Sequence, residues 1–382
     1  MRCQEAGMSS VPLQVVEFPP VALLTGAVII GSALIAVATL TVGVSLWEAW
    51  RRRRQKAIRA ELTSELLEAL FGRDDPEWEQ WVGSLSARQR RELEPVLDSY
   101  LRSLDGSDRT KLAKVGPVLG INDRSRRHLH GGSYWRRLHA LTWLTLLRDP
   151  PDRDLLRTYC TRTPRERATA ARILYASETS DCSTTGTDLL LADTPSAFSV
   201  FGVDTLYRVS EGNPSPLFER AATDYDEWSP ALTQQVLLVT RHLNTVVGSA
   251  DLSWITKSLS SKTERVRVAA YRALDAYGWN SDIRTHVDVQ AISEEPSPAV
   301  RASAYRMLGA WGDGAAISEL RLAAAVESDP RARVVAVKAL YPHDHHTLAD
   351  VPPELADAWA WAAEHARFDA LARDISSRRS HQ

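Results

Sequence analysis

The stretch PSPAVRASAYRMLGAWGD, residues 296–313, decides the fold. It contains VRASAYRML (300–308), a nine-residue pattern that occurs again as VRVAAYRAL (266–274) and ARVVAVKAL (332–340). In the copy at 266–274 the apolar positions fall at i, i+3, i+4, i+7 and i+8, which is one face of a helix. A small residue at the centre of that face lets a neighbouring helix pack closely. The pattern therefore predicts an amphipathic helix that is repeated along the chain.

Weaker copies extend the repeat toward the N-terminus, at 136–144 and 166–174. Each copy ends in a marker leucine, with an alanine four residues before it and an arginine seven residues before it. The repeated arginines are Arg137, Arg167, Arg267, Arg301 and Arg333. Leu206 and Leu243 fit the gap by spacing alone, without the arginine, so the copies follow one another every 30–37 residues. We expect each arginine to bond or cap a neighbouring turn, and the alanines and leucines to form the core.

A second helical stretch precedes several copies, at 251–259, 283–292 and 315–326. Loops with helix-stop and helix-start residues, such as Ser328-Asp329-Pro330, separate the two helices of a pair. Two helices in about 32 residues, neither of which buries its apolar face alone, are typical of stacked repeats. The sequence therefore predicts an all-α protein built as an α-solenoid.

These residues also carry a family resemblance. Pro296–Asp313 and Ser328–Leu340 resemble HEAT repeats of the phycobilisome-lyase-like type, whose pattern is a D/P turn followed by V-R-x-x-A-x-x-A-L-G and often G-D. The matching residues are Val300, Arg301, Ala304, Leu308, Gly309 and Asp313. The copy at 266–278 departs from the pattern with Asp275 in place of the glycine. The resemblance covers about 133–342, most strongly 262–342, and implies a solenoid of HEAT-type helix pairs that binds partners rather than a particular reaction.

A long uncharged run lies near the N-terminus, between Glu17 and Glu48. Within it, residues 21–47 are apolar or small throughout. This run is long enough to span a membrane, because a helix needs about 20 such residues to cross a bilayer core of ~30 Å. The expected membrane-interface anchors follow as Trp47, Trp50, Arg51, Arg52, Arg53 and Arg54. Only Arg2 is basic before the run, so the positive-inside rule places the N-terminus outside and the C-terminal domain in the cytoplasm. We predict one transmembrane helix that holds the chain in the cell membrane.

Two other interpretations of this run exist. Ala36-Val37-Ala38 is an A-x-A site at which a signal peptide could be cleaved, and the run could instead be a buried helix of a soluble protein. We favour the anchor because the run continues to Trp47 and then ends in a dense arginine block.

The predicted organisation has five parts. They are a short extracytoplasmic N-terminus (1–20), the transmembrane helix (21–47), a juxtamembrane helical region or N-terminal cap (51–132), the HEAT-repeat solenoid (133–342), and a C-terminal capping helix and tail (343–382). Trp359 and Trp361 are expected to cover the apolar face of the last repeat. Region 109–148 is rich in arginine and histidine, which suits anionic lipid headgroups, an acidic partner, nucleic acid or an ordinary solvated face. We favour the solvated face.

Composition and motifs give no sign of an enzyme. The chain of 382 residues has 46 Lys+Arg and 48 Asp+Glu, and its three cysteines exclude a disulfide framework and a C-x-x-C zinc pair. The sequence contains no phosphate-binding loop, no dinucleotide-binding glycine motif, no H-E-x-x-H and no G-x-S-x-G. The dense cluster His343-Asp344-His345-His346 is expected to be a loop rather than a metal site. We therefore predict no catalytic residue, no metal and no cofactor.

The predicted function is a membrane-anchored HEAT-repeat scaffold that mediates protein–protein interaction at the cytoplasmic face, with a protein partner that the sequence does not identify. A first alternative is an enzyme or enzyme subunit built on the solenoid, such as a lyase-like modifier. A second alternative is binding of nucleic acid or anionic lipid through 109–148. Nucleic acid comes last because residues 51–382 are balanced, with 45 basic and 45 acidic side chains.

Overall fold

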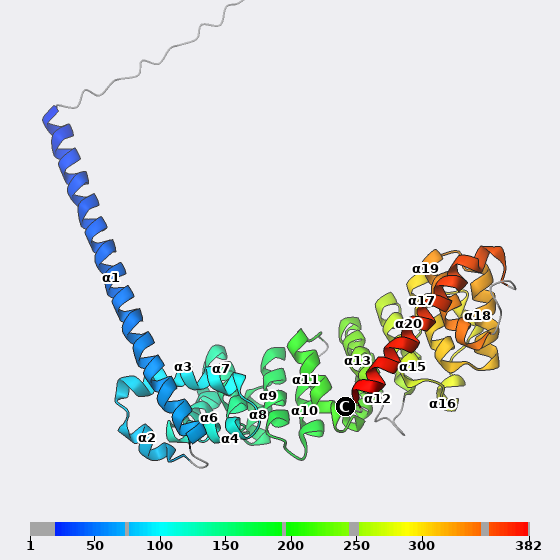
Figure 1. Ribbon diagram of the computed structural model, residues 1–382, viewed down its shortest axis with the longest axis horizontal. Coiled ribbons are helices and arrows are strands. Elements are labelled where there is room, and N and C mark those ends of the chain that lie inside the picture. Colours follow the sequence, from blue (N-terminus) through cyan, green and yellow to red (C-terminus); the bar gives the residue numbers. More distant parts are fainter. Residues whose placement is uncertain (1–19, 73–75, 193–195, 244–251, 345–350, 381–382) are drawn as a thin grey trace, which may run out of the picture. The chain divides into compact units, whose positions relative to one another are not determined.

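The computed structural model describes residues 20–72, 76–192, 196–243, 252–344 and 351–380, and for 20–30, 33 and 372–380 it describes the backbone only (Figure 1). Within these ranges the chain is all-α, with short 3-10 turns and no strand. It divides into two compact units, Met1–Leu112 and Ala113–Gln382.

The first unit is dominated by one long helix. Helix α1 (Pro20–Gly72) runs for 53 residues without a break, because neither proline nor glycine occurs between residues 44 and 71. The predicted membrane segment and the juxtamembrane helix are therefore one element. Its last turns bury Leu62, Leu66 and Leu70 and pack on α3 (Ala87–Ser103). Helices α2 (Trp78–Ser84) and α4 (Gly106–Ala113) complete the unit.

The middle of α1 exposes a series of apolar side chains. The large ones are Leu34, Ile35, Val37, Leu40, Val42, Val44, Leu46, Trp47 and Trp50. Among the residues that the structure describes, no helix carries an apolar stretch long enough to cross a membrane. The side chains of 21–30, the first part of the predicted transmembrane helix, lie outside the described residues, as do residues 1–19 of the predicted N-terminus.

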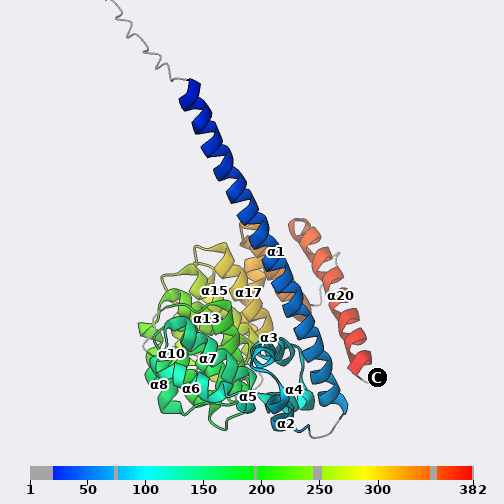
Figure 2. The same ribbon diagram turned by 90° about the vertical axis from the view of Figure 1, so that its left-hand side faces the viewer.

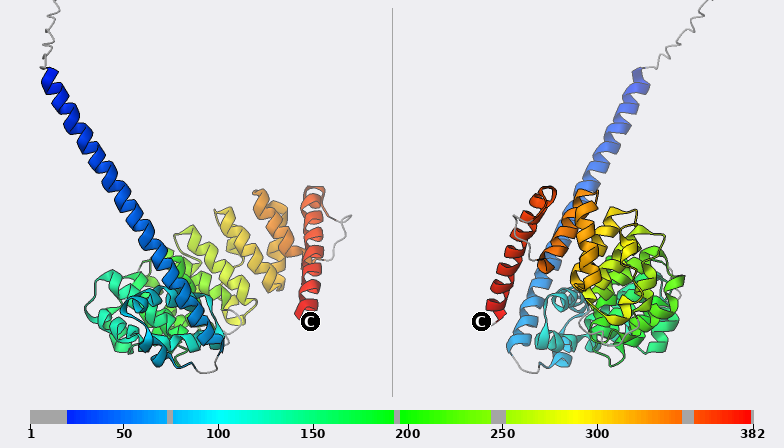
Figure 3. Two further views of the ribbon diagram at one scale, coloured as in Figure 1. Left: turned by 60° about the vertical axis from the view of Figure 1, so that its left-hand side comes forward. Right: turned by 90° about the vertical axis from the view of Figure 1, so that its right-hand side faces the viewer.

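Seven helices of the second unit form a row in which each helix packs on the next, most tightly from α13 to α19 (Figure 3). They are α7 (Tyr134–Leu146), α9 (Pro164–Ala176), α11 (Val200–Glu211), α13 (Pro230–His242), α15 (Glu264–Tyr277), α17 (Pro298–Trp311) and α19 (Pro330–Leu340). We call them the signature row, because they carry the repeated pattern. All seven marker leucines are buried, including Leu206 and Leu243, which were placed by spacing alone.

Further helices, most of them shorter, form a second layer beside the signature row. They are α5 (Val115–Val118), α6 (Ile121–Gly131), α8 (Arg153–Tyr159), α10 (Cys182–Leu191), α12 (Ser215–Asp224), α14 (Ser253–Ser258), α16 (Ser281–Arg284) and α18 (Gly314–Val326). Helix α10 packs on α9 and α11, and α18 packs on α17 and α19. One core cluster runs from α9 to α20, and a second one joins α6, α7, α8 and α9. Two layers of paired helices with such cores are compatible with a helical-repeat solenoid.

The predicted helix at 283–292 is interrupted. Only α16 and a 3-10 turn, η2 (Gln290–Ile292), form there. Between them the Asp288 carboxylate accepts hydrogen bonds from the backbone N–H groups of Gln290 and Ala291, and this turn competes with helix. Val287 and Val289 are both buried, a spacing of two that a helix does not place on one side.

Polar caps start most helices of the signature row. Side chains that accept a hydrogen bond from a backbone N–H in the first turn are Thr163, Ser199, Ser229, Ser297 and Asp329, and a proline follows four of them at 164, 230, 298 and 330. Each cap of this kind contributes about 1 kcal/mol, and proline suits the first turn of a helix.

A last long helix ends the chain. Helix α20 (Ala356–Ser380) follows the 3-10 turns η3 (Tyr341–His343) and η5 (Pro353–Leu355) and packs on α19. Figure 2 shows it as a single straight helix. Trp359 and Ala362 are buried, whereas Trp361 is exposed. The first half of α20 thus contributes to the core at the end of the signature row.

Candidate functional site

The repeated arginines connect consecutive repeats. The guanidinium of Arg301 donates through Nε and Nη2 to the two carboxylate oxygens of Glu327, at 2.8 and 2.6 Å, and through Nη1 to the carbonyl oxygen of Glu295 at 2.7 Å. Arg267 is placed in the same way. It donates to both carboxylate oxygens of Glu295, at 3.0 and 2.8 Å, and to the carbonyl oxygen of Ser261 at 2.8 Å.

Each glutamate in turn serves two arginines. The carboxylate of Glu327 accepts from Arg301, while its carbonyl oxygen accepts from Arg333 at 2.8 Å. Glu295 does the same for Arg267 and Arg301. A continuous chain of hydrogen bonds therefore runs Arg267–Glu295–Arg301–Glu327–Arg333, and we call it the Arg-Glu ladder.

The two remaining signature arginines make related contacts near the other end of the row. Arg137 donates to the buried carboxylate of Glu166 at 2.8 Å and to the carbonyl oxygen of Gly132 at 2.7 Å. Arg167 donates to the carbonyl oxygen of Ala192 at 3.1 Å. The partner glutamates were not singled out from the sequence. The sequence does contain a signal for Glu295 and Glu327, because each stands six residues before the arginine of a copy, Arg301 or Arg333.

The Arg301–Glu327 pair is the most deeply buried part of the ladder. Only 2% of the Glu327 side chain and 12% of the Arg301 side chain are exposed. The Arg301 hydrogen bonds hold the pKa of Glu327 at about 2 despite its burial, with help from the backbone N–H of Asp329 and the hydroxyl of Tyr305, which donates at 2.8 Å. Burial and the Glu327 carboxylate both raise the pKa of Tyr305. Removing two charges from water costs several kcal/mol, and only such complete hydrogen bonding offsets that cost.

A shallow hollow of about 660 Å³ lies beside the ladder, where three consecutive row helices begin. Its lining comes from the first turns of α15, α17 and α19 and includes Arg267, Ser297, Ala302 and Arg331. A ladder arginine therefore also borders the open surface that crosses these repeats.

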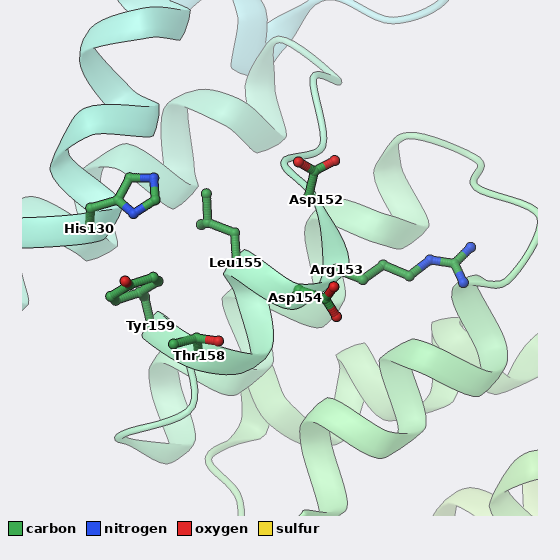
Figure 4. A pocket seen from close by; sticks show the side chains of 7 residues that line it. All are labelled: His130, Asp152, Arg153, Asp154, Leu155, Thr158 and Tyr159. Carbon is green, nitrogen blue, oxygen red and sulfur yellow. The ribbon is translucent and has the colours of Figure 1, made fainter.

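A second hollow, of about 760 Å³, lies between α6 and α8 (Figure 4). Figure 4 shows His130 and Tyr159 on one side, and Asp152, Arg153 and Asp154 on the other. The two rings meet edge to face, 5.0 Å between centroids, and Arg153 forms an ion pair with Asp181. The histidine and the arginine of this hollow thus already interact with neighbouring side chains.

Several arginines of the basic region 109–148 make ion pairs within the second unit. Besides Arg137, Arg126 pairs with Asp149 at 2.5 Å, and Arg148 lies 3.7 Å from Glu178. Part of the positive charge of this region is therefore balanced by acids that lie outside it in the sequence.

The histidine cluster at 343–346 is described only in part. The His343 ring Nε2 lies 2.7 Å from the carbonyl oxygen of Gly309, whereas the buried Asp344 pairs with Arg321. His345 and His346 lie outside the described residues. Within the described ranges, no group of three histidine, cysteine, aspartate or glutamate side chains is arranged to hold a metal ion.

The predicted interface anchors follow one another on α1. The guanidinium groups of Arg51 and Arg54 each lie 5.4 Å from the centre of a tryptophan ring, Trp47 and Trp50 respectively. Arg52 pairs with Glu48 at 2.8 Å, and Arg53 is exposed. Both tryptophans are exposed.

No family model matches the chain, and neither a curated protein nor a solved structure matches it. The resemblance to HEAT repeats thus rests on the residues of 296–313 and 328–340.

Proposed function

We propose that the protein is a membrane-anchored scaffold, built of HEAT-type helix pairs of the phycobilisome-lyase-like kind, that holds a protein partner at the cytoplasmic face of the cell membrane. The Arg-Glu ladder is the observation that carries this proposal. It links α15, α17 and α19 through the signature arginine of each helix and the glutamates in the loops before α17 and α19.

The ladder suits a binding scaffold for a physical reason. A buried arginine that donates to both oxygens of a carboxylate fixes distance and angle more strictly than apolar packing does. Helices held in one register present a preorganised surface, which lowers the entropy that binding must overcome. A row of such helices spreads the contact with a partner over several repeats.

Helix α1 supports the membrane part of the proposal. Its exposed apolar side chains, Leu34 to Leu46, are unfavourable in water at about 25 cal/mol per Å² of apolar surface. The sequence of 21–30 continues the uncharged run. The tryptophans and arginines that end the run are the residues found at a cytoplasmic boundary. Anchoring raises the concentration of the row beside other membrane proteins.

Charge substitutions in the apolar run test the anchor. We expect the full chain to stay in the membrane pellet after an alkaline carbonate wash, and the double variant Val37→Arg/Val44→Arg to leave it, because each central arginine costs about 2.5–3.5 kcal/mol in a bilayer. Ala60→Arg, an exposed position of the same helix beyond the run, is the control and should stay. Release of the wild-type chain by carbonate contradicts the anchor, and digestion of a C-terminal tag by protease outside intact cells contradicts the orientation.

Affinity purification tests the scaffold itself. The full chain and the double variant are purified after chemical crosslinking in cells, and the retained proteins are compared. We expect one specific protein with both forms, in lower yield with the variant because only the anchor is lost. If neither form retains a partner, the scaffold function is wrong.

A further inference from the structure

Basic side chains occupy one equivalent position on the last four helices of the signature row. Two residues before the marker leucine stand Arg241 on α13, Arg272 on α15, Arg306 on α17 and Lys338 on α19. This position is five residues after that of the ladder arginine, which is about 140° further around a helix. The two positions therefore face different sides: the ladder faces the neighbouring helices, and Arg272 and Arg306 are exposed on the outer side.

Three of these side chains are unpaired. Among the described residues, Arg241, Arg272 and Arg306 make no ion pair and donate no hydrogen bond. We call these three the outer arginine row. Burial first of all, and then the charges of Arg306 and Arg241, lower the pKa of Arg272. Burial raises the pKa of Asp275, and the positive charges of Arg241 and Arg306 lower it by less.

The outer arginine row is bounded on both sides. On α9 the equivalent residue is Arg172, which pairs at 2.7 Å with Asp204, the equivalent residue of α11. On α19 the ammonium of Lys338 lies 3.2 Å from His365 Nε2 and 5.9 Å from the centre of the Trp361 ring, and both of these residues belong to α20. Arginines at this position that form no ion pair among the described residues therefore lie on three consecutive helices, α13, α15 and α17.

We propose that the outer arginine row binds a short acidic segment of the protein partner in polyproline II conformation, with a carboxylate at every third residue. This inference rests on the proposed function and names the chemistry of its partner. Packed helix axes lie about 8–10 Å apart, and one turn of a polyproline II chain, three residues, spans about 9 Å and returns the side chain to the same side. Carboxylates at i, i+3 and i+6 therefore match the spacing of three consecutive helices.

The observations favour a peptide over nucleic acid. A protein that binds duplex DNA typically contacts 6–10 phosphates, whereas this row offers three charges. Small side chains lie on the same outer side, including Ala269, Ala302 and the exposed Ala310. They leave room for the backbone of a bound peptide to approach the helices.

Fluorescence anisotropy of the full chain in neutral detergent tests the proposal. The probe is a labelled peptide of four Gly-Ser-Glu repeats, and the reference peptide carries Gln in place of Glu. We expect the Glu peptide to bind at least tenfold more tightly than the Gln peptide, and Arg272→Gln and Arg306→Gln each to weaken it about tenfold, the typical effect of one charge-assisted hydrogen bond. Arg265→Gln is the matched control, because it removes the same charge from the same helix about 10 Å away, and it should change the affinity less than twofold.

Two results overturn the proposal. One is equal binding of the Glu peptide by the wild type and by Arg272→Gln, with the fold of the variant verified by circular dichroism. The other is tighter binding of a twelve-nucleotide oligothymidine, or of vesicles containing phosphatidylserine, through the same arginines. The partner retained by crosslinking separates this inference from the proposed function. If Arg272→Gln retains the partner at the wild-type level, the outer arginine row does not bind it, but the scaffold function still holds. If no form retains a partner, the scaffold function is wrong, and the affinity for the Glu peptide remains a separate result.

Discussion

Replacing Glu327 by glutamine tests the Arg-Glu ladder most directly. The amide keeps the shape of the side chain but replaces one accepting oxygen by an NH2 group, which then faces donors. Those donors are the Arg301 guanidinium, the Tyr305 hydroxyl and the Asp329 backbone N–H. Breaking one partner of a buried ion pair typically costs about 3–5 kcal/mol. We expect Glu327→Gln to lower the free energy of unfolding by about 3 kcal/mol at pH 7.

The pKa of Glu327 gives an independent magnitude. It is lowered from 4.5 to about 2 by the Arg301 hydrogen bonds first of all. At 1.36 kcal/mol per pKa unit, this shift is worth about 3 kcal/mol. Because the folded state holds the pKa below its unfolded value, this contribution is fully present above pH 4.5 and is lost as the pH falls toward 2. The wild type should therefore lose about 2 kcal/mol of its advantage over Glu327→Gln between pH 7 and pH 3.

Urea unfolding of the full chain in detergent, followed by circular dichroism at 222 nm, measures both effects. Glu294→Gln is the control, since it removes an exposed carboxylate from the loop that holds the neighbouring ladder residue Glu295. This control should unfold like the wild type. Two results would refute the reasoning: a deficit of Glu327→Gln that is the same at pH 3 as at pH 7, or a variant as stable as Glu294→Gln at pH 7.

Two further predictions concern packing. Gly309→Ala should lower the free energy of unfolding by about 1–3 kcal/mol, because a Cβ there would lie 2.8 Å from the Cβ of Ala339. Adding Ala339→Gly should restore part of this loss in the same urea assay. If the double variant instead loses further stability additively, the two positions are not in contact. Cys160 is fully buried, and burial raises the pKa of its thiol to about 12; its alkylation by iodoacetamide at pH 8, followed by mass spectrometry, should be at least about a hundredfold slower in the native chain than in urea, and equal rates would show that the side chain is accessible.

The repeated helices could be predicted because their signal is local. Each copy carries its apolar face, its small central residue and its marker leucine within nine residues, and this local pattern sufficed even where the arginine is missing. On α11 the central small residue is Gly202, and a Cβ there would lie 2.8 Å from Phe198 Cβ. The position holds alanine in the five copies that carry the arginine, glycine on α11 and valine (Val239) on α13.

The candidate site depends on contacts that no single copy contains. The glutamates of the ladder lie in the loops before α17 and α19, 28 and 26 residues after the arginines that they bind. Aligning the copies shows that the position two residues before the marker leucine is basic in five of them. Alignment does not show that Arg172 is neutralised by Asp204, whereas Arg241, Arg272 and Arg306 have no such partner among the described residues. Pairing across helices is a tertiary property, so this part required the structure.

The ladder arginines and the outer arginines should differ in what they contribute to the free energy of unfolding. This difference gives a second test of their roles. A ladder arginine is desolvated and satisfied, so its removal lowers stability. An outer arginine is partly solvated and repelled by its neighbours, and exposed charges contribute little to stability, typically less than about 1 kcal/mol. Arg272→Gln should therefore unfold at the same or a higher urea concentration than the wild type while it loses affinity for the acidic peptide. Loss of stability together with affinity would instead assign Arg272 a structural role.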